Sequence, residues 1–181
     1  MKLIALVGMA GSGKSVVSKL FGEEYKIIRF GNITDEILKK RNLPLTEENE
    51  KNFREHIRAE HGMAAYAKLN LEKIKENLKK NHVVIDGLYS WEEYLVLKKE
   101  FPKLTLVAVY APPETRYLRL GEREVRSLTK EQSEERDKKE LKNLNKAPPI
   151  AMADYTILNT GTMFDLKNNF DKFIEWMLEN E

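Results

Sequence analysis

The octet GMAGSGKS, from Gly8 to Ser15, constrains the fold more than any other stretch of this chain. It follows the apolar run LIALVG and leads into KSVVSKLFG, whose apolar spacing is typical of a helix. A Gly-x-x-x-x-Gly-Lys-Ser pattern between a strand and a helix predicts a loop that binds phosphate groups.

The glycines and the lysine of this octet each have a physical reason. Gly11 and Gly13 allow backbone torsions that are closed to other residues, so successive N–H groups turn inward and form an anion nest at the start of a helix. Lys14 is then predicted to neutralise phosphates, and the Ser15 hydroxyl to ligate Mg²⁺. The predicted nucleotide-binding residues here are Gly8, Ala10, Gly11, Ser12, Gly13, Lys14, Ser15 and Val16.

Short β-branched apolar runs recur along the chain, separated mostly by longer segments of helical period. This alternation predicts an α/β protein with a parallel sheet covered by helices. A length of 181 residues suits one domain, residues 1–181. The expected strands lie at residues 2–8, 26–30, 82–86, 103–111 and 154–160.

Two segments are expected to leave the sheet. Residues 32–80 carry apolar residues at helix-like intervals on charged ground, which predicts a helical insert. Residues 119–146 are highly charged and nearly free of large apolar residues, so we expect an exposed and mobile helix there. The tetrapeptides APPE and APPI are predicted to start helices, because proline suits the first helical turn.

Charge and cysteine content exclude several function classes. Lys and Arg number 31 against 29 Asp and Glu, and this balance gives no general attraction to nucleic acid or to a membrane surface. The absence of cysteine excludes disulfides, thiolate zinc sites and thiol nucleophiles. With no apolar run of signal-peptide or membrane length, we expect a cytoplasmic protein, either a monomer or a homodimer.

Three kinds of phosphate chemistry compete. A switch GTPase would carry an Asn-Lys-x-Asp loop, and the nearest match, NKAP at Asn145 to Pro148, lacks the acid. A motor-type ATPase would carry an acid run, whereas VVIDGLYS supplies one acid, Asp86. Asp86 ends an apolar strand, where open α/β sheets bind ligands, so we expect it to bind Mg²⁺ through water or to accept a hydrogen bond from a phosphate acceptor.

The charged segment favours the third class, a kinase with a closing lid. Phosphoryl transfer needs cations that arrive with the lid and exclude water. Arg116, Arg119 and Arg123 are predicted to share one helix face and to point at one phosphate chain. Arg126 and Arg136 lie in the same segment.

The stretches GMAGSGKS, DGLYS, APPETRYLRLGER and ADYTILNTGT, in this order, resemble the P-loop nucleoside monophosphate kinases and dephospho-coenzyme A kinases, and most of all an adenylate-kinase-related branch. The resemblance runs from Leu3 to about Phe173. It implies a three-layer fold with a five-stranded parallel sheet in the order 2-3-1-4-5, helices on both faces, a helical acceptor-binding insert and a helical lid. It also implies these roles: phosphate contact for Arg119 and Arg123, a lid arginine at Arg136, and an adenine frame of Asn159, Thr160 and Gly161.

The chain departs from that family where the acceptor is read. Asn32 stands in place of an acid, and Asp35 and Tyr89 stand in place of arginines. Because charge-assisted contacts to a phosphate are worth about 1.5–3 kcal/mol each, plain AMP is disfavoured as acceptor. Arg54 and Arg58 are the predicted replacements. The predicted acceptor-binding residues are Asn32, Arg54, Arg58, Gly87 and Tyr89.

The sequence therefore predicts an ATP- and Mg²⁺-dependent kinase of a nucleotide or nucleotide-like small molecule. Its predicted metal ligands are Ser15 and Asp86. Two alternatives stay open: transfer to the ribose hydroxyl of dephospho-coenzyme A, with Asp86 as proton acceptor, and a nucleotide-sensing ATPase that is not a kinase. The predicted catalytic residues are Lys14, Asp86, Arg119, Arg123 and Arg136.

Overall fold

A parallel β-sheet forms the centre of the protein. The structure, a computed structural model, describes residues 1–124 and 126–180. In this described part the sheet has five strands in the order β2-β3-β1-β4-β5, which confirms the predicted topology. The strands are β1 (Leu3–Val7), β2 (Tyr25–Arg29), β3 (His82–Asp86), β4 (Thr105–Tyr110) and β5 (Tyr155–Leu158).

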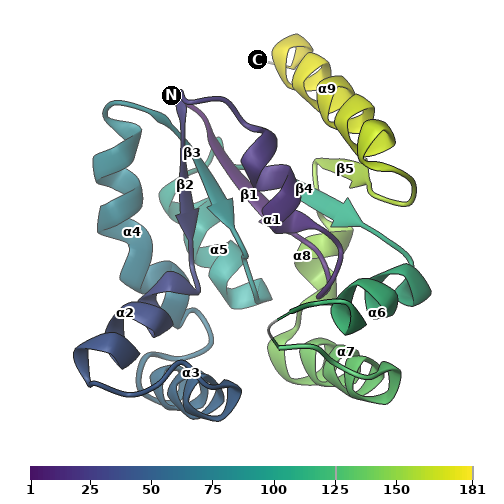
Figure 1. Ribbon diagram of the computed structural model, residues 1–181. Coiled ribbons are helices and arrows are strands. Elements are labelled where there is room, and N and C mark those ends of the chain that lie inside the picture. Colours follow the sequence, from purple (N-terminus) through teal and green to yellow (C-terminus); the bar gives the residue numbers. More distant parts are fainter. Residues whose placement is uncertain (125, 181) are drawn as a thin grey trace.

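Strand β1 is central and buried on both faces, because its residues alternate between two apolar clusters. Leu3, Ala5 and Val7 face the cluster that includes side chains of α4 (Ala65–Leu78) and α5 (Trp91–Glu100). Ile4 and Leu6 face the cluster that includes α1 (Lys14–Val17) and α9 (Met163–Glu179). Figure 1 shows these helices on opposite faces of the sheet, which is the predicted three-layer arrangement.

The order in which the chain adds strands reverses at β1, which pairs with β3 on one side and with β4 on the other. Ligands of open α/β sheets bind beyond the carboxyl ends of the strands at such a point. The loop after β1, which contains the glycine octet, lies there. The two predicted excursions flank the same edge in Figure 1, with α2 and α3 on one side and α6 and α7 on the other.

The excursions are helical, as predicted. Thr46 and Thr129 cap the start of one helix in each excursion, and Ser90 caps α5 outside them; each side chain accepts a hydrogen bond from a backbone N–H three residues later. Helices do begin at APPE and APPI. The bounds are α2 (Asn32–Lys40), α3 (Glu47–His61), α6 (Pro113–Gly121), α7 (Lys130–Leu144) and α8 (Ala147–Ala151), and a 3-10 turn, η1 (Ser18–Leu20), follows α1.

Helix α7 corrects the prediction of a fully exposed lid helix. Ser133, Asp137 and Glu140 are buried at intervals of four and three residues, so one polar face of α7 packs inward. These residues are held by hydrogen bonds rather than by apolar contact, and the prediction counted apolar residues only. A polar stripe of this kind is stable when its groups are paired.

The predicted shared face of Arg116, Arg119 and Arg123 is also wrong. Helix α6 ends at Gly121, so Arg123 lies beyond it. Arg116 is buried and donates two hydrogen bonds to Asp137 of α7, at 2.9 and 2.5 Å, instead of lying open to a phosphate chain. Across the described residues, the helices are too short or too polar to cross a membrane.

Candidate active site

The glycine octet forms a loop that wraps the start of α1. Gly8, Gly11 and Gly13 have φ values of 144°, 80° and 98°, a region that favours glycine. A side chain at Gly8 would collide with the carbonyl of Val109, and one at Gly13 with the amide of Asn159. Gly8 is therefore required by the fixed backbone of Val109, and Gly13 by its positive φ together with the position of Asn159.

The loop presents backbone donors at the helix start. The first α-helical bond runs from the Val17 N–H to the Gly13 carbonyl, at 3.0 Å, so the N–H groups of Lys14 and Ser15 precede it. Such N–H groups are suited to phosphate oxygens. The Ser15 side chain is exposed, so its hydroxyl is open to a bound group, and Val16 beside it is also exposed.

Other loop residues are tied to the elements behind them. The Ala10 carbonyl accepts a hydrogen bond from Arg116 Nη1 at 3.1 Å. The Ser12 carbonyl accepts one from Asn159 Nδ2 at 2.8 Å, and Asn159 Oδ1 accepts one from Arg119 Nη2 at 3.3 Å. The loop is thus fixed from α6 and from the end of β5. Asn159 supports the phosphate loop, while Thr160 and Gly161 lie exposed after β5; an adenine frame of these three residues stays a prediction.

Lys14 folds back on its own loop. Its ammonium donates to the carbonyl of Gly8 at 2.8 Å and to that of Met9 at 3.1 Å. Burial and then the positive charge of Lys146 lower the pKa of Lys14 to about 7. The buried, charged form of Lys14 is therefore unfavourable in the free protein. A bound anion would stabilise this form, because it would raise the pKa of Lys14 and replace the two carbonyl contacts.

Asp86 lies at the carboxyl end of β3, opposite Leu6 of β1, and its side chain is buried. Ser18 Oγ is 3.5 Å from its Oδ2. The charge of Asp86 raises the pKa of Lys14, which indicates that the two predicted catalytic groups lie in one site. In the described residues no cluster of three acidic or histidine ligands exists, but a hydroxyl and one carboxylate suit Mg²⁺, which takes few protein ligands beside phosphate oxygens and water. Ser15 and Asp86 fit that role.

Tyr89 covers the space after β3 where the acceptor is predicted to bind. A side chain on Gly87 would lie 2.8 Å from its hydroxyl oxygen, and one on Gly31 would lie 3.3 Å away. Burial raises the pKa of Tyr89 to about 12, so it stays a neutral hydroxyl at physiological pH. Gly31 directly precedes Asn32, the first residue of α2, so the predicted residues Asn32, Gly87 and Tyr89 border one region.

Glu93 holds the backbone of Tyr89 in place, a role that was not predicted from the sequence. It is fully buried and accepts a hydrogen bond from the Tyr89 N–H at 2.7 Å. Burial raises the pKa of Glu93 to about 7. A glutamate three residues after Ser90 is a known signal of a helix cap, and the sequence offered that signal without indicating burial.

Helix α3 brings the predicted arginines Arg54 and Arg58 to the same region. Arg54 donates to Glu50 Oε2 at 3.3 Å. Arg58 lies over the ring of Tyr66, 5.4 Å from its centroid, and within the described residues its buried Nε has no hydrogen-bond partner. An unpartnered buried guanidinium N–H is a donor available to a ligand.

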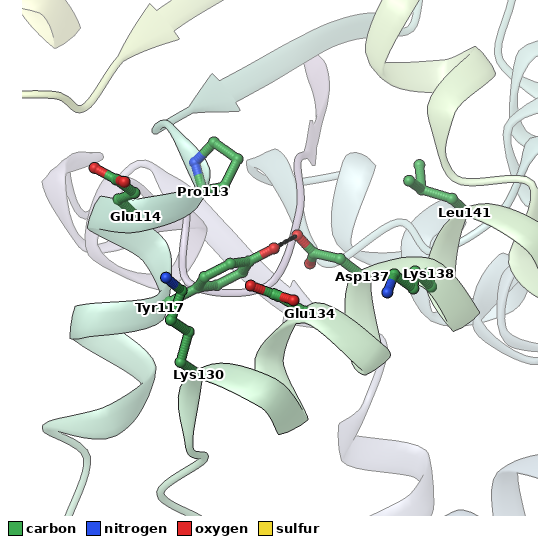
Figure 2. A pocket seen from close by; sticks show the side chains of 8 residues that line it. All are labelled: Pro113, Glu114, Tyr117, Lys130, Glu134, Asp137, Lys138 and Leu141. Carbon is green, nitrogen blue, oxygen red and sulfur yellow. Dashed lines mark hydrogen bonds between the residues drawn. The ribbon is translucent and has the colours of Figure 1, made fainter.

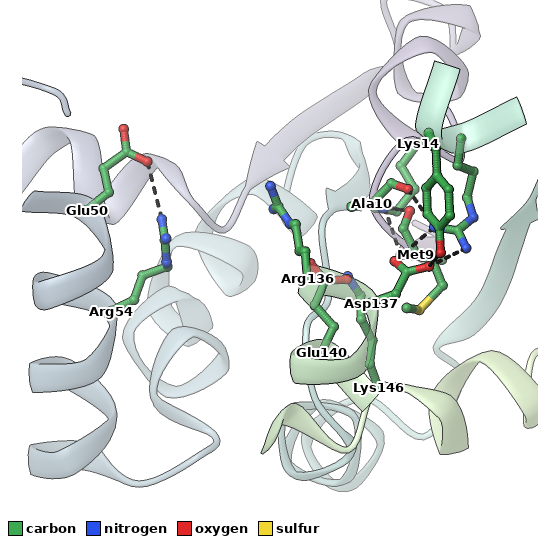
Figure 3. Close-up of polar contacts among 12 residues, drawn as sticks. Met9, Ala10, Lys14, Glu50, Arg54, Arg136, Asp137, Glu140 and Lys146 are labelled. Carbon is green, nitrogen blue, oxygen red and sulfur yellow. Dashed lines mark hydrogen bonds and ion pairs between the residues drawn. The ribbon is translucent and has the colours of Figure 1, made fainter. Parts of the chain in front are cut away.

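Arginines of the lid form a second group of cations. Burial, then the charges of Arg136, Arg126 and Arg29, lower the pKa of Arg123, so four arginines lie near one another: Arg29 at the end of β2, Arg136 on α7, and Arg123 and Arg126 in the segment between α6 and α7. Arg136 donates to Glu140 Oε1 at 3.1 Å. Figure 3 shows Arg136 extending from α7 on the side that faces Glu50 and Arg54.

The buried pairs behind the lid carry no signal in the sequence. Arg116 links Ala10 of the loop to Asp137 of α7, and Tyr117 also donates to Asp137, at 3.0 Å. The hollow between α6 and α7, of about 460 Å³, lies next to this pair and is shown in Figure 2. None of the predicted catalytic or binding residues lines it.

Comparison with known proteins gives consistent results. An AAA domain matches residues 4–143. A UPF0200 protein of Thermococcus onnurineus is 38% identical over 182 residues, which cover 97% of this chain and 98% of that protein. A UPF0200 protein of Methanococcus maripaludis, MmarC6_1392, is 37% identical over 183 residues, covering 96% and 98%.

Solved structures share the fold at low sequence identity. Shikimate kinase from Bacteroides thetaiotaomicron aligns with a TM-score of 0.63 at 15% identity, covering 97% of this chain and 98% of that one. A gluconokinase from Sinorhizobium meliloti aligns with a TM-score of 0.56 at 15% identity, covering 99% and 97%. The five-stranded sheet with its flanking helices is thus the P-loop kinase fold.

Proposed function

This chain belongs to the UPF0200 family, and from that premise we propose that it is an ATP-dependent phosphotransferase that moves the γ-phosphate to a small, nucleotide-like acceptor. The observation that carries the proposal is the convergence on Lys14 of charged groups from three other elements. Asp86 comes from β3, Arg136 from α7, and Lys146 from the start of α8. This set supports phosphoryl transfer, because cations beside the γ-phosphate neutralise the charge on the oxygens of the transferred group.

The donor half of the reaction follows from the octet. The N–H groups at the start of α1 bind phosphate oxygens, and the Lys14 ammonium leaves its two carbonyl acceptors for the β- and γ-phosphates. Ser15 and Asp86 would hold Mg²⁺, which supplies neutralising charge between the phosphates when bound. The residues predicted to frame the adenine are Asn159, Thr160 and Gly161.

The acceptor half lies between α2, α3 and the end of β3. Arg54 and Arg58 are proposed to bind an anionic group of the acceptor, and the neutral Tyr89 hydroxyl to orient it over Gly87. During transfer, the phosphoryl group is stabilised by the positive charges of Arg119, Arg123 and Arg136, which also exclude water. The chemistry is positional, and no covalent enzyme intermediate is required.

A second acceptor chemistry is favoured by one observation. Asp86 is a buried carboxylate beside Lys14, in a place where it can take the proton of a hydroxyl acceptor. The fold neighbours named shikimate kinase and gluconokinase phosphorylate, by their names, hydroxyl-bearing acids. Transfer to a hydroxyl, including the ribose hydroxyl of dephospho-coenzyme A, is therefore the alternative to transfer onto a phosphate.

The experiment that tests the proposal measures ADP and phosphorylated product with Mg²⁺-ATP and a panel of acceptors. The panel holds AMP, CMP, UMP, dTMP, dephospho-coenzyme A, shikimate and gluconate. A kinase gives acceptor-dependent ADP and a phosphorylated acceptor, and Lys14→Ala lowers turnover at least about 100-fold with the fold intact. Acceptor-independent hydrolysis alone, or a Lys14→Ala variant of near-normal rate, contradicts the proposal and supports a nucleotide-sensing module.

A further inference from the structure

Lys146 is a buried cation at the junction between α7 and α8. Its side chain is 3% exposed. The ammonium donates to Glu140 Oε2 at 2.7 Å and lies 5.8 Å from the centroid of the Tyr89 ring. One ion therefore contacts the lid helix on one side and the acceptor-side tyrosine on the other.

The charges around Lys146 do not balance. Glu140 is shared, since Arg136 donates to its Oε1 at 3.1 Å while Lys146 donates to its Oε2. Both cations lower the pKa of Glu140 to about 2, against the opposing effect of burial. Lys14 lies close enough for its pKa to be lowered by the charge of Lys146, and Asp86 is the further acid that faces Lys14. Glu93 is a third buried acid near Lys146, and Arg58 also acts on it. Four cations thus face three carboxylates.

Burying a surplus of positive charge is costly unless an anion arrives to complete the site. A lysine that served only to join α7 to α8 would need no more than its ion pair with Glu140. The place of Lys146 near both Lys14 and Tyr89 instead matches the path between the donor phosphate and the acceptor.

We propose that Lys146 is a catalytic residue that contacts the phosphoryl group during its transfer, and that Glu140 is the positioning residue that aims it. This inference rests on the proposed phosphotransferase function. In the step, the bond between the γ-phosphorus and the bridging oxygen breaks and its electron pair stays with ADP, while an acceptor oxygen bonds to phosphorus. The proton of a hydroxyl acceptor leaves through Asp86 to water; a phosphate acceptor has none to lose. Lys146 keeps its protons throughout and neutralises oxygen charge.

The test compares Lys146→Met with Lys142→Met, a matched control at an exposed position in the last turn of α7. Lys146→Met is expected to lower kcat about 100-fold with the best acceptor, and to change the Kd of ADP less than about threefold. Lys142→Met is expected to match the unmodified protein. Lys146→Arg, which retains the charge but not the shape, is expected to recover part of kcat.

A charge-neutral pair guards against simple misfolding. Lys146→Met leaves Glu140 with Arg136 alone, so the double variant Glu140→Gln/Lys146→Met removes both buried charges together. Folding of both variants is checked by thermal unfolding. Loss of kcat in the double variant with a normal melting curve supports the catalytic role, whereas near-normal kcat in either folded variant overturns it.

A second readout separates this inference from the proposed function. If no acceptor in the panel is phosphorylated, the phosphotransferase proposal fails, and Lys146 is judged by binding alone. A residue that contacts the γ-phosphate gives Lys146→Met at least about a tenfold loss in affinity for AMP-PNP relative to ADP. An unchanged ratio of the two dissociation constants overturns the contact whatever the acceptor result.

Discussion

The P-loop lysine is the residue whose surroundings predict a measurable effect of pH. Burial and the charge of Lys146 lower the pKa of Lys14 to about 7 in the free protein. Phosphate oxygens favour the charged ammonium, so its pKa in the nucleotide complex must be higher. The contribution of Lys14 to the affinity for ADP is therefore constant below about pH 7 and falls as pH rises above it, by up to about tenfold per pH unit.

Calorimetry at pH 8 checks this directly, because phosphate groups are then fully ionised and any proton taken up from the buffer binds to the protein. Titration of ADP in two buffers of different ionisation enthalpy is expected to show proton uptake on binding. Lys14→Arg is the control, since arginine stays charged at this pH and should bind without taking up a proton. Binding without proton uptake in the unmodified protein would contradict the lowered pKa.

At the scale of elements, a buried ion pair between Arg116 of α6 and Asp137 of α7, here called the polar joint, attaches the lid helix. Arg116 Nη1 and Nη2 donate to the two oxygens of Asp137, and both side chains are buried. Asp137→Asn leaves the guanidinium buried without its counter-ion and is expected to cost about 3–5 kcal/mol of the free energy of unfolding. Hydrogen exchange is expected to accelerate first in residues 130–144, because α7 loses its main attachment.

Urea unfolding and exchange of the two forms provide the measurement, with Glu135→Gln as the matched control. Glu135 is exposed on the same helix and pairs with Lys139 at 2.5 Å. An exposed ion pair contributes about 0–1 kcal/mol, so the control should change little. Equal effects of the two substitutions would show that the joint at Asp137 does not hold α7.

The joint also shows why part of the site could be predicted from the sequence and part could not. The octet and the strands are local patterns, and the sheet order came with the family resemblance; all of these hold in the structure. The packing of α7 depends on partners outside the helix, Arg116 for Asp137 and Lys146 for Glu140. A charged residue is predicted to lie at the surface unless its partner is known. The periodicity therefore predicted an exposed helix where the structure has a buried polar face.

Lys146 illustrates the same limit in the candidate site. In the sequence, the stretch NKAP matches only part of a guanine-binding loop. Asn145, in the left-handed conformation, ends α7, and Lys146 directly precedes α8, so the turn between two helices places the lysine inside. Nothing in the spacing of the residues indicates that burial, because it arises from the way α8 packs against α5 and β4.

At the scale of the whole molecule, one carboxylate joins the two excursions. Glu50 of α3 is 4% exposed and accepts a hydrogen bond from Arg54 of its own helix. It also pairs with Arg126, which follows α6 and lies 76 positions away in sequence. Arg54 is proposed to bind the acceptor, and Arg126 lies near Arg123, which is proposed to stabilise the phosphoryl group. An anionic ligand must therefore compete with Glu50 for them.

Glu50→Gln removes the charge that holds these two arginines and is expected to loosen the lid from the insert. Because the chain contains no cysteine, spin labels can be placed at Asn52→Cys on α3 and Lys138→Cys on α7, both at exposed positions. The distribution of distances between the labels is expected to broaden and lengthen in Glu50→Gln. The exposed Glu55→Gln on the same helix should leave it unchanged, and an identical distribution in all three proteins would mean that Glu50 does not hold the excursions together.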